Sequence, residues 1–211
     1  MNEHYPFVNP PLPYAYDALE PYIDTLTMHL HHDRHLQTYV DNLNKALKDY
    51  PALHDWSLEE LLTNADRLPA DIRTPVRNNA GGVYNHIFYF SGMSPSDTRH
   101  YAGALYDAVV RDFGSTDAFF QRFKDAALSV FGSGYTWLTA DGSGKLSIIT
   151  TANQDTPLTR GLCPVATIDV WEHAYYLKHY NDRAGYIDDW FQVANWKRAG
   201  ELYRLCVSEL S

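Results

Sequence analysis

The sequence is poor in cysteine and in basic residues. Its 211 residues include two cysteines, Cys163 and Cys206, and neither belongs to a CxxC pair, so no disulfide framework is expected. The 17 Lys and Arg are outnumbered by 26 Asp and Glu, which gives a formal net charge of −9. Because polyphosphate and anionic lipid are bound by clustered cations, this balance argues against nucleic-acid and membrane partners.

Long hydrophobic runs are missing as well. The apolar runs are far shorter than the ~20 residues that a membrane-spanning helix needs. The N-terminus shows no basic segment followed by an apolar one, and this pattern predicts a cytoplasmic protein without a secretory signal. With 45% hydrophobic and 20% charged residues, the composition is that of a globular protein and excludes collagen-like and disordered chains.

The pattern of the first half of the chain predicts helices. Residues 5–16 form a proline-rich and aromatic arm, and residues 24–50 lack Pro and Gly and predict a long helix. A capping box at 57–60 opens a short helix. A further helix is expected to start at Thr74-Pro75 and to run to residue 90. It contains the pair Gly81-Gly82, and because glycine weakens a helix, close packing against another segment is expected there.

The second half has a different pattern, beyond a breaker-rich segment at 91–96. Helices are expected at 101–113, 117–131 and 194–208, and strands at 135–139, 145–151 and 164–170, the first two joined by DGSG at 141–144. The sequence thus predicts an α+β protein. We expect an all-helical N-terminal domain over 1–93 and a C-terminal α+β domain over 94–211 with a small, mainly three-stranded antiparallel sheet.

The chain holds 10 histidines, and several have a spacing that suggests chemistry. His31, His35 and Tyr39 recur every four residues, so on a helix they lie within an arc of roughly 80°. A hydrated helix face would give the same pattern. Asp169 and His173 are also four residues apart and can meet at one point if a helix begins there, although an N-cap and a surface histidine would look the same.

His86 alone is typical of a buried core histidine. Together, however, His31, His86, Asp169 and His173 offer three imidazoles and one carboxylate, a set that suits a first-row transition metal with one position open. The carboxylate partly neutralises a trivalent ion, so the set favours redox cycling between M(III) and M(II) over hydrolysis.

Six motifs extend over nearly the whole chain in a fixed order. They are LPYAYDALEP at 12–21, HHDRHLQTYV at 31–40, NNAGG at 78–82 followed by Asn85-His86, FGSG at 131–134, TANQD at 151–155 and DVWEHAYYL at 169–177. In this order they resemble the iron/manganese superoxide dismutases. The resemblance implies that the N-terminal domain is a long antiparallel helical hairpin and that an α+β domain follows it. It also implies an enzyme that converts two superoxide radicals to O₂ and hydrogen peroxide.

The resemblance also implies roles for single residues near the metal. His31, His86, Asp169 and His173 would be the ligands. Tyr39 would be the phenol at the substrate channel, Gln154 would bind the solvent molecule on the metal, and His35 would join this catalytic group. Trp137 and Trp171 would form part of an aromatic shell. In contrast, Tyr135 and Phe90 stand where the family usually has tryptophan.

Other residues are implied at a subunit contact. Tyr176 would meet His35 across a homodimer interface, with a homotetramer as the alternative, and Glu172 would reach His173 of the partner subunit. Arg183 would be the cation near the substrate funnel.

Gly82 together with Gln154 resembles the manganese type, so one manganese ion per subunit is expected, with iron as the alternative. Two other functions remain open on the same ligands, a non-redox metal-binding protein and a non-haem iron oxygenase, whose facial triad would need two histidines and one carboxylate and would leave one candidate histidine without a role.

Overall fold

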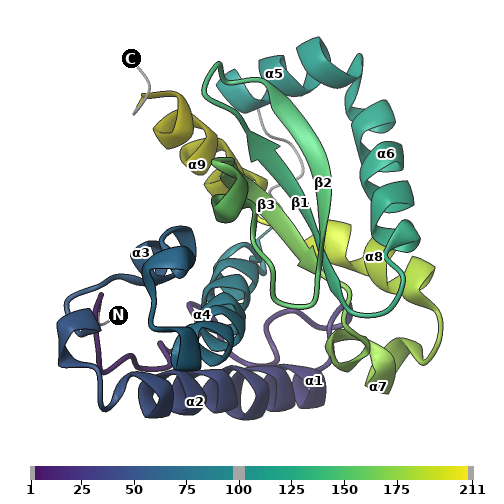
Figure 1. Ribbon diagram of the computed structural model, residues 1–211. Coiled ribbons are helices and arrows are strands. Elements are labelled where there is room, and N and C mark those ends of the chain that lie inside the picture. Colours follow the sequence, from purple (N-terminus) through teal and green to yellow (C-terminus); the bar gives the residue numbers. More distant parts are fainter. Residues whose placement is uncertain (1–2, 97–102, 209–211) are drawn as a thin grey trace.

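Helices make up the first half of the chain, and a small sheet with its covering helices makes up the second (Figure 1). The computed structural model describes residues 3–96 and 103–208. The helices are α1 (Thr25–Leu30), α2 (Gln37–Leu47), α3 (Leu58–Thr63), α4 (Ala70–Ser91), α5 (Ala104–Phe113), α6 (Thr116–Ser129), α7 (Tyr176–His179), α8 (Arg183–Val193) and α9 (Trp196–Ser208). The strands are β1 (Gly134–Ala140), β2 (Leu146–Ala152) and β3 (Cys163–Asp169).

The long helix expected over 24–50 is interrupted by a wider turn. Helix α1 begins after Asp24, whose side chain accepts the Thr27 N–H at 2.8 Å. A π-helical segment, His31–Leu36, then separates α1 from α2. Insertions of this kind are frequent at functional sites, because they turn side chains away from the regular helical register. His31 is the first residue of this segment.

Helix α4 begins earlier than expected. The capping box at Ser57 and Glu60 is confirmed at the start of α3, but the prediction that the next helix starts at Thr74-Pro75 is wrong, since α4 starts at Ala70 and contains Pro75. Ile72 is buried in the added turn. A proline this near the N-terminus of the helix removes a single backbone hydrogen bond. The stabilisation from burying one more turn outweighs this loss.

Helices α2 and α4 form the hairpin that supports one side of the site. They pack against each other, with Val40 and Leu43 of α2 and Val76 and Ala80 of α4 fully buried. The predicted helical hairpin is confirmed. None of the helices within 3–96 and 103–208 is both long enough and apolar enough to cross a membrane.

The sheet has the order β2-β1-β3 with antiparallel pairing throughout. The central strand β1 is buried along its whole length, and α5, α6 and α9 pack against the sheet. Residues 141–144 form the predicted hairpin turn, in which the Asp141 carboxylate accepts the N–H groups of Ser143 and Lys145. The predicted α+β domain is therefore confirmed. The β1–β3 register places Tyr135 opposite Asp169.

The ends of several predicted elements differ from the observed ones by a few residues. The helix predicted at 101–113 is α5, and its first two predicted residues lie outside the described part of the chain. The helix at 194–208 starts at Trp196, after an extended Ala194. The arm at 5–16 contains no strand and no helix, and Phe7 anchors it because the Asn44 side chain bonds both Phe7 backbone groups at 2.8 Å.

Candidate metal centre

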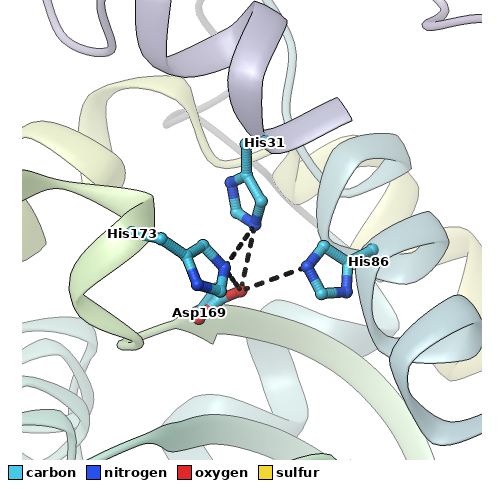
Figure 2. A group of neighbouring side chains, drawn as sticks. All are labelled: His31, His86, Asp169 and His173. Carbon is cyan, nitrogen blue, oxygen red and sulfur yellow. Dashed lines mark hydrogen bonds and ion pairs between the residues drawn. The ribbon is translucent and has the colours of Figure 1, made fainter. Parts of the chain in front are cut away.

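Four side chains from distant parts of the sequence converge between the helical hairpin and the end of the sheet (Figure 2). His31 comes from the start of the π-helical segment, and His86 comes from α4. Asp169 is the last residue of β3, and His173 lies in the short 3₁₀ turn that follows. One donor atom from each lies within 4.8 Å of the other three.

The distances between these donor atoms fit one shared ion. From Asp169 Oδ2, the Nε2 atoms of His31, His173 and His86 lie at 3.2, 3.6 and 4.0 Å. The Nε2 atoms of His31 and His173 are 3.2 Å apart. Two ligands that are each about 2.1 Å from a metal are roughly 3–4 Å apart, so the donors are already spaced like a coordination shell.

Two of the donors are buried and lack a partner. His86 Nδ1 donates to the Gly82 carbonyl at 2.7 Å, which directs the lone pair of Nε2 into the cluster. Among the described residues, His86 Nε2 and Asp169 Oδ2 have no hydrogen-bond partner of good geometry. Buried acceptors without a partner are costly, and a cation would satisfy both of them. The backbone carbonyl that fixes a ring nitrogen is also the usual support of a metal-bound histidine.

Burial and charge set the protonation states of the cluster. Desolvation lowers the pKa of His31 to about 4, and it lowers the pKa of His86 well below the ordinary value, with the neighbouring His31 adding to the effect. Burial alone would raise the pKa of Asp169, but its contacts with His173 and His31 outweigh burial and lower it well below the usual range. His31 and His86 are thus neutral near pH 7 and Asp169 is an anion, a donor set suited to a cation.

A hydrogen-bonded row of polar groups lies beside the cluster. Gln154 Nε2 donates to the Tyr39 hydroxyl at 3.1 Å, and Asn85 Nδ2 donates to Gln154 Oε1 at 3.2 Å. The Tyr39 ring centroid lies 5.2 Å from that of His86. Burial raises the pKa of Tyr39, so its hydroxyl keeps its proton near neutral pH. Asn85 was not among the predicted site residues. Its position directly before His86 in the sequence was the signal that could have identified it.

The glycine pair of α4 explains how this row fits. A Cβ atom at Gly81 would lie 2.2 Å from the Gln154 carbonyl oxygen, and one at Gly82 would lie 2.4 Å from the Tyr39 ring. The expectation of close packing at Gly81-Gly82 is confirmed. Both Gln154 and Tyr39 therefore approach the helix backbone in a way that only glycine permits.

Aromatic rings enclose the cluster at two distances. The Trp171 ring lies 5.5 Å from the ring of His173. Trp137 lies further out, where it packs 5.8 Å from the Tyr135 ring and donates to Thr151 Oγ1 at 2.9 Å. Tyr135, which occupies the position nearer the ligands, is fully buried, and its hydroxyl lies 3.4 Å from His86 Nδ1.

Sequence reasoning missed the tyrosines that support Asp169 from behind. The Tyr186 hydroxyl donates to the Asp169 backbone carbonyl at 2.8 Å and lies 2.9 Å from the Tyr89 hydroxyl. Both rings are fully buried. Nothing in the spacing of these residues announces the contact, because Tyr186 is in α8 and Tyr89 is in α4.

The residues expected at a subunit contact are placed at the surface. Glu172 is exposed, and Tyr176 is 49% exposed. His35 is half-buried with its ring 4.2 Å from that of His173. These three residues therefore connect the buried cluster to one outer face.

Arg183 holds a turn near the same face. Its Nη1 donates to the Val130 carbonyl at 2.5 Å and its Nη2 to the Gly132 carbonyl at 3.1 Å. Its Nε donates to the Tyr175 hydroxyl at 3.1 Å. The turn that Arg183 holds presents Phe131, which is fully exposed.

Comparisons with known proteins cover both halves of the chain. Residues 6–94 match the family model described as iron/manganese superoxide dismutases, alpha-hairpin domain, and residues 101–202 match the C-terminal domain of the same description. The chain is 49% identical to "Superoxide dismutase [Mn] 1" of Leptolyngbya boryana over 92% of its own length and 79% of that protein. It is 46% identical to "Superoxide dismutase [Mn]" of Thermus aquaticus over 95% of its own length and 98% of that protein.

Proposed function

Because the chain belongs to the iron/manganese superoxide dismutase family, we propose that His31, His86, Asp169 and His173 bind one manganese ion per subunit and that the protein dismutates superoxide there. The observation that supports this most directly is the buried pair of unpartnered acceptors, His86 Nε2 and Asp169 Oδ2, which face the other two donors. Neutral imidazoles with one carboxylate leave room in the coordination shell for a small anionic substrate.

The chemistry that a bound manganese supplies is one-electron redox between M(III) and M(II), by which two superoxide anions and two protons become O₂ and hydrogen peroxide. The protein's own residues hold the protons and exclude bulk water. The Tyr39 hydroxyl accepts the Gln154 amide at 3.1 Å, so its own proton is free to point toward the channel. Asn85 fixes the other end of the same amide and orients the Gln154 N–H groups.

The resemblance of Gly82 and Gln154 to the manganese type supports manganese as the metal. Gln154 reaches the site from the sheet side, and the Tyr39 ring fills the space above Gly82, where a side chain on α4 would otherwise stand. A hydrogen bond to metal-bound solvent adjusts the potential of the metal. The two relatives named above carry manganese in their names, which supports the same metal here, with iron as the alternative.

Reconstitution of metal-free protein separately with manganese and with iron tests the proposed function. We expect the manganese form to hold one ion per chain and to dismutate superoxide, and the iron form to be much less active. Equal activity in both forms would overturn the metal assignment. Bound metal without activity in either form would overturn the function and leave a metal-binding protein, and oxygen-dependent oxidation of an added organic substrate would indicate an oxygenase.

Replacing Tyr39 with phenylalanine separates proton supply from metal binding. We expect Tyr39→Phe to keep its manganese and to lose roughly a hundredfold in dismutase turnover, the lower end of the effect of a positioned proton-transfer group. Metal content and turnover are measured on the same sample, beside Tyr50→Phe, whose hydroxyl bonds Asp71 on the surface. Loss of the metal in Tyr39→Phe alone would contradict a role in proton supply.

The exposed face around Tyr176 supports a homodimer. Phe131, Tyr176, Leu177 and Tyr180 expose 103, 49, 48 and 66% of their surface, and exposed large apolar side chains that gather on one face mark interfaces. A two-fold contact across this face would bring His35 of one subunit toward Tyr176 of the other. A homotetramer would need a second face and is the alternative outcome of a mass measurement.

Glu172 is expected to hold that dimer and its metal. We predict that Glu172→Ala shifts sedimentation toward the monomer and lowers the manganese content after dialysis, because His173 of the partner subunit would lose the carboxylate that reaches it across the contact. Glu201→Ala, on the exposed side of α9, is the matched control and should change neither. A dimer of unchanged stability with full metal content would count against this role for Glu172.

Three further predictions belong to the proposed function: the domain boundary, the role of Arg183 and the cellular location. A boundary between residues 93 and 94 is supported by the two family matches, which end at 94 and begin at 101. Arg183 lies beside the exposed turn at 130–132, and its action as the funnel cation stays a prediction. The location of the protein in the cytoplasm also stays a prediction.

A further inference from the structure

The two cysteines of the chain form one disulfide that the metal chemistry does not use. Cys163 and Cys206 are bonded with their Cα atoms 5.9 Å apart and a sequence separation of 43. This Cα separation lies in the middle of the range that an unforced disulfide adopts. The sequence contains no further cysteine, so within one chain there is no competing pair.

The position of this disulfide relates it to the metal centre. Cys163 is the first residue of β3, and the last residue of the same strand is Asp169. Cys206 lies near the end of α9, which packs along β3 and whose Tyr203 hydroxyl donates to the Gly144 carbonyl at 2.7 Å. The disulfide therefore fastens the last helix to the strand that carries the carboxylate ligand.

The two cysteines differ in their exposure to solvent. Cys163 is partly exposed, whereas Cys206 is 3% exposed. An oxidant from solution would thus meet Cys163 first, and Cys206 would be held next to it as the second thiol. In reducing compartments such pairs are usually reversible and sense oxidants. Hydrogen peroxide is the oxidant that the enzyme itself releases, if the proposed function is right.

We propose that Cys163 and Cys206 are a peroxide-oxidised thiol pair whose disulfide locks α9 onto the metal-ligand strand. The Cys163 thiolate attacks one oxygen of hydrogen peroxide, the O–O bond breaks, and one water leaves with a sulfenic acid on Cys163. The Cys206 thiol then attacks that sulfur, the S–S bond forms, and the second water leaves. Two thiols and one peroxide become one disulfide and two waters, and the sulfur atoms supply both electrons.

Thiol chemistry on the manganese-loaded protein tests the order of these steps. Reduced protein is freed of reductant without air and treated with a small molar excess of hydrogen peroxide, and free thiols and linked peptides are then measured. We expect the wild type to lose both thiols into one intrachain link. Cys206→Ser should collect a dimedone-reactive sulfenic acid on Cys163, and Cys163→Ser should keep its Cys206 thiol.

Thermal unfolding tests the effect of the link. Cross-linking over this loop length is expected to raise Tm by about 10 °C for the oxidised over the reduced wild type. The Cys163→Ser/Cys206→Ser double variant should have the same Tm with and without reductant. Thiols that survive the peroxide, links between chains, or equal Tm values for the two wild-type forms would overturn the proposal.

Added peroxide makes this proposal testable apart from the enzyme's own activity. Dismutase activity and metal content are measured on the same samples. If the protein lacks dismutase activity but still forms the intrachain disulfide, the proposed function is wrong and the thiol proposal is supported, and the peroxide then comes from another source. If the protein is an active dismutase but its thiols do not react with peroxide, the thiol proposal is wrong and the proposed function is supported.

Discussion

Asp169→Asn is expected to lose its manganese and nearly all of its dismutase activity. Asparagine has the same shape and can still accept the Trp171 N–H, which the Asp169 Oδ1 atom accepts at 2.8 Å. It removes the one negative charge of the donor set, and it offers a neutral amide where three imidazole nitrogens lie 3.2–4.0 Å from Oδ2. Changing even the supports of a metal ligand costs 10–100-fold in affinity, so losing the ligand itself should cost about 100-fold or more.

Metal content after dialysis and turnover of superoxide measure this loss. Circular dichroism establishes that Asp169→Asn is folded, and added manganese should restore activity only at far higher concentration than in the wild type. Asp41→Asn is the matched control, because Asp41 accepts the Gln37 amide at 2.8 Å on an exposed helix face. Wild-type manganese content in Asp169→Asn would show that the ion lies elsewhere.

The sheet and the capped helices were predictable because their signals are local. The DGSG turn at 141–144 sits between two β-branched runs, and its hydrogen bonds close within a few residues. Ser57 and Glu60 satisfy each other's backbone at the start of α3. Capping and turn hydrogen bonds depend only on residues that are close in sequence, so they can be predicted from a single sequence.

The helix irregularities were not predictable, since they depend on distant packing. Nothing in the sequence around His31 marks the π-helical segment, and the start of α4 is fixed by burial of Ile72 in preference to the Pro75 signal. At the start of α4, tertiary packing overrides a local preference against proline inside a helix that is worth up to about 3 kcal/mol.

The candidate site was predictable in its residue types and only partly in its neighbours. Four-residue spacing and the motif order pointed to His31, Asp169 and His173, although His31 and His173 are 142 residues apart in sequence. The support of Asp169 by Tyr186 has no sequence pattern. The pairing of Cys163 with Cys206 had none either, because two cysteines alone do not reveal whether β3 and α9 lie together.

Gly81→Ala is expected to destabilise the protein. Alanine favours a helix over glycine by up to about 1 kcal/mol, so an unhindered site would gain from this change. At Gly81, however, the new Cβ would lie 2.2 Å from the Gln154 carbonyl oxygen, a backbone atom that cannot rotate away. Overpacking of this kind costs typically 1–3 kcal/mol. We therefore expect a lower free energy of unfolding, together with weakened activity as Gln154 shifts from Tyr39.

Gly200→Ala is the matched control for Gly81→Ala. Gly200 also lies inside a helix, α9, and the nearest atom to its added Cβ would be the Leu105 Cβ at 4.0 Å. This variant should be as stable as the wild type or slightly more stable. Denaturant unfolding of both metal-free variants should separate them by about 1–3 kcal/mol, the overpacking cost at Gly81, because the helix preference for alanine is common to both. Equal stability would mean that Gln154 yields easily, and the glycine at 81 would then not be what lets the sheet approach the hairpin.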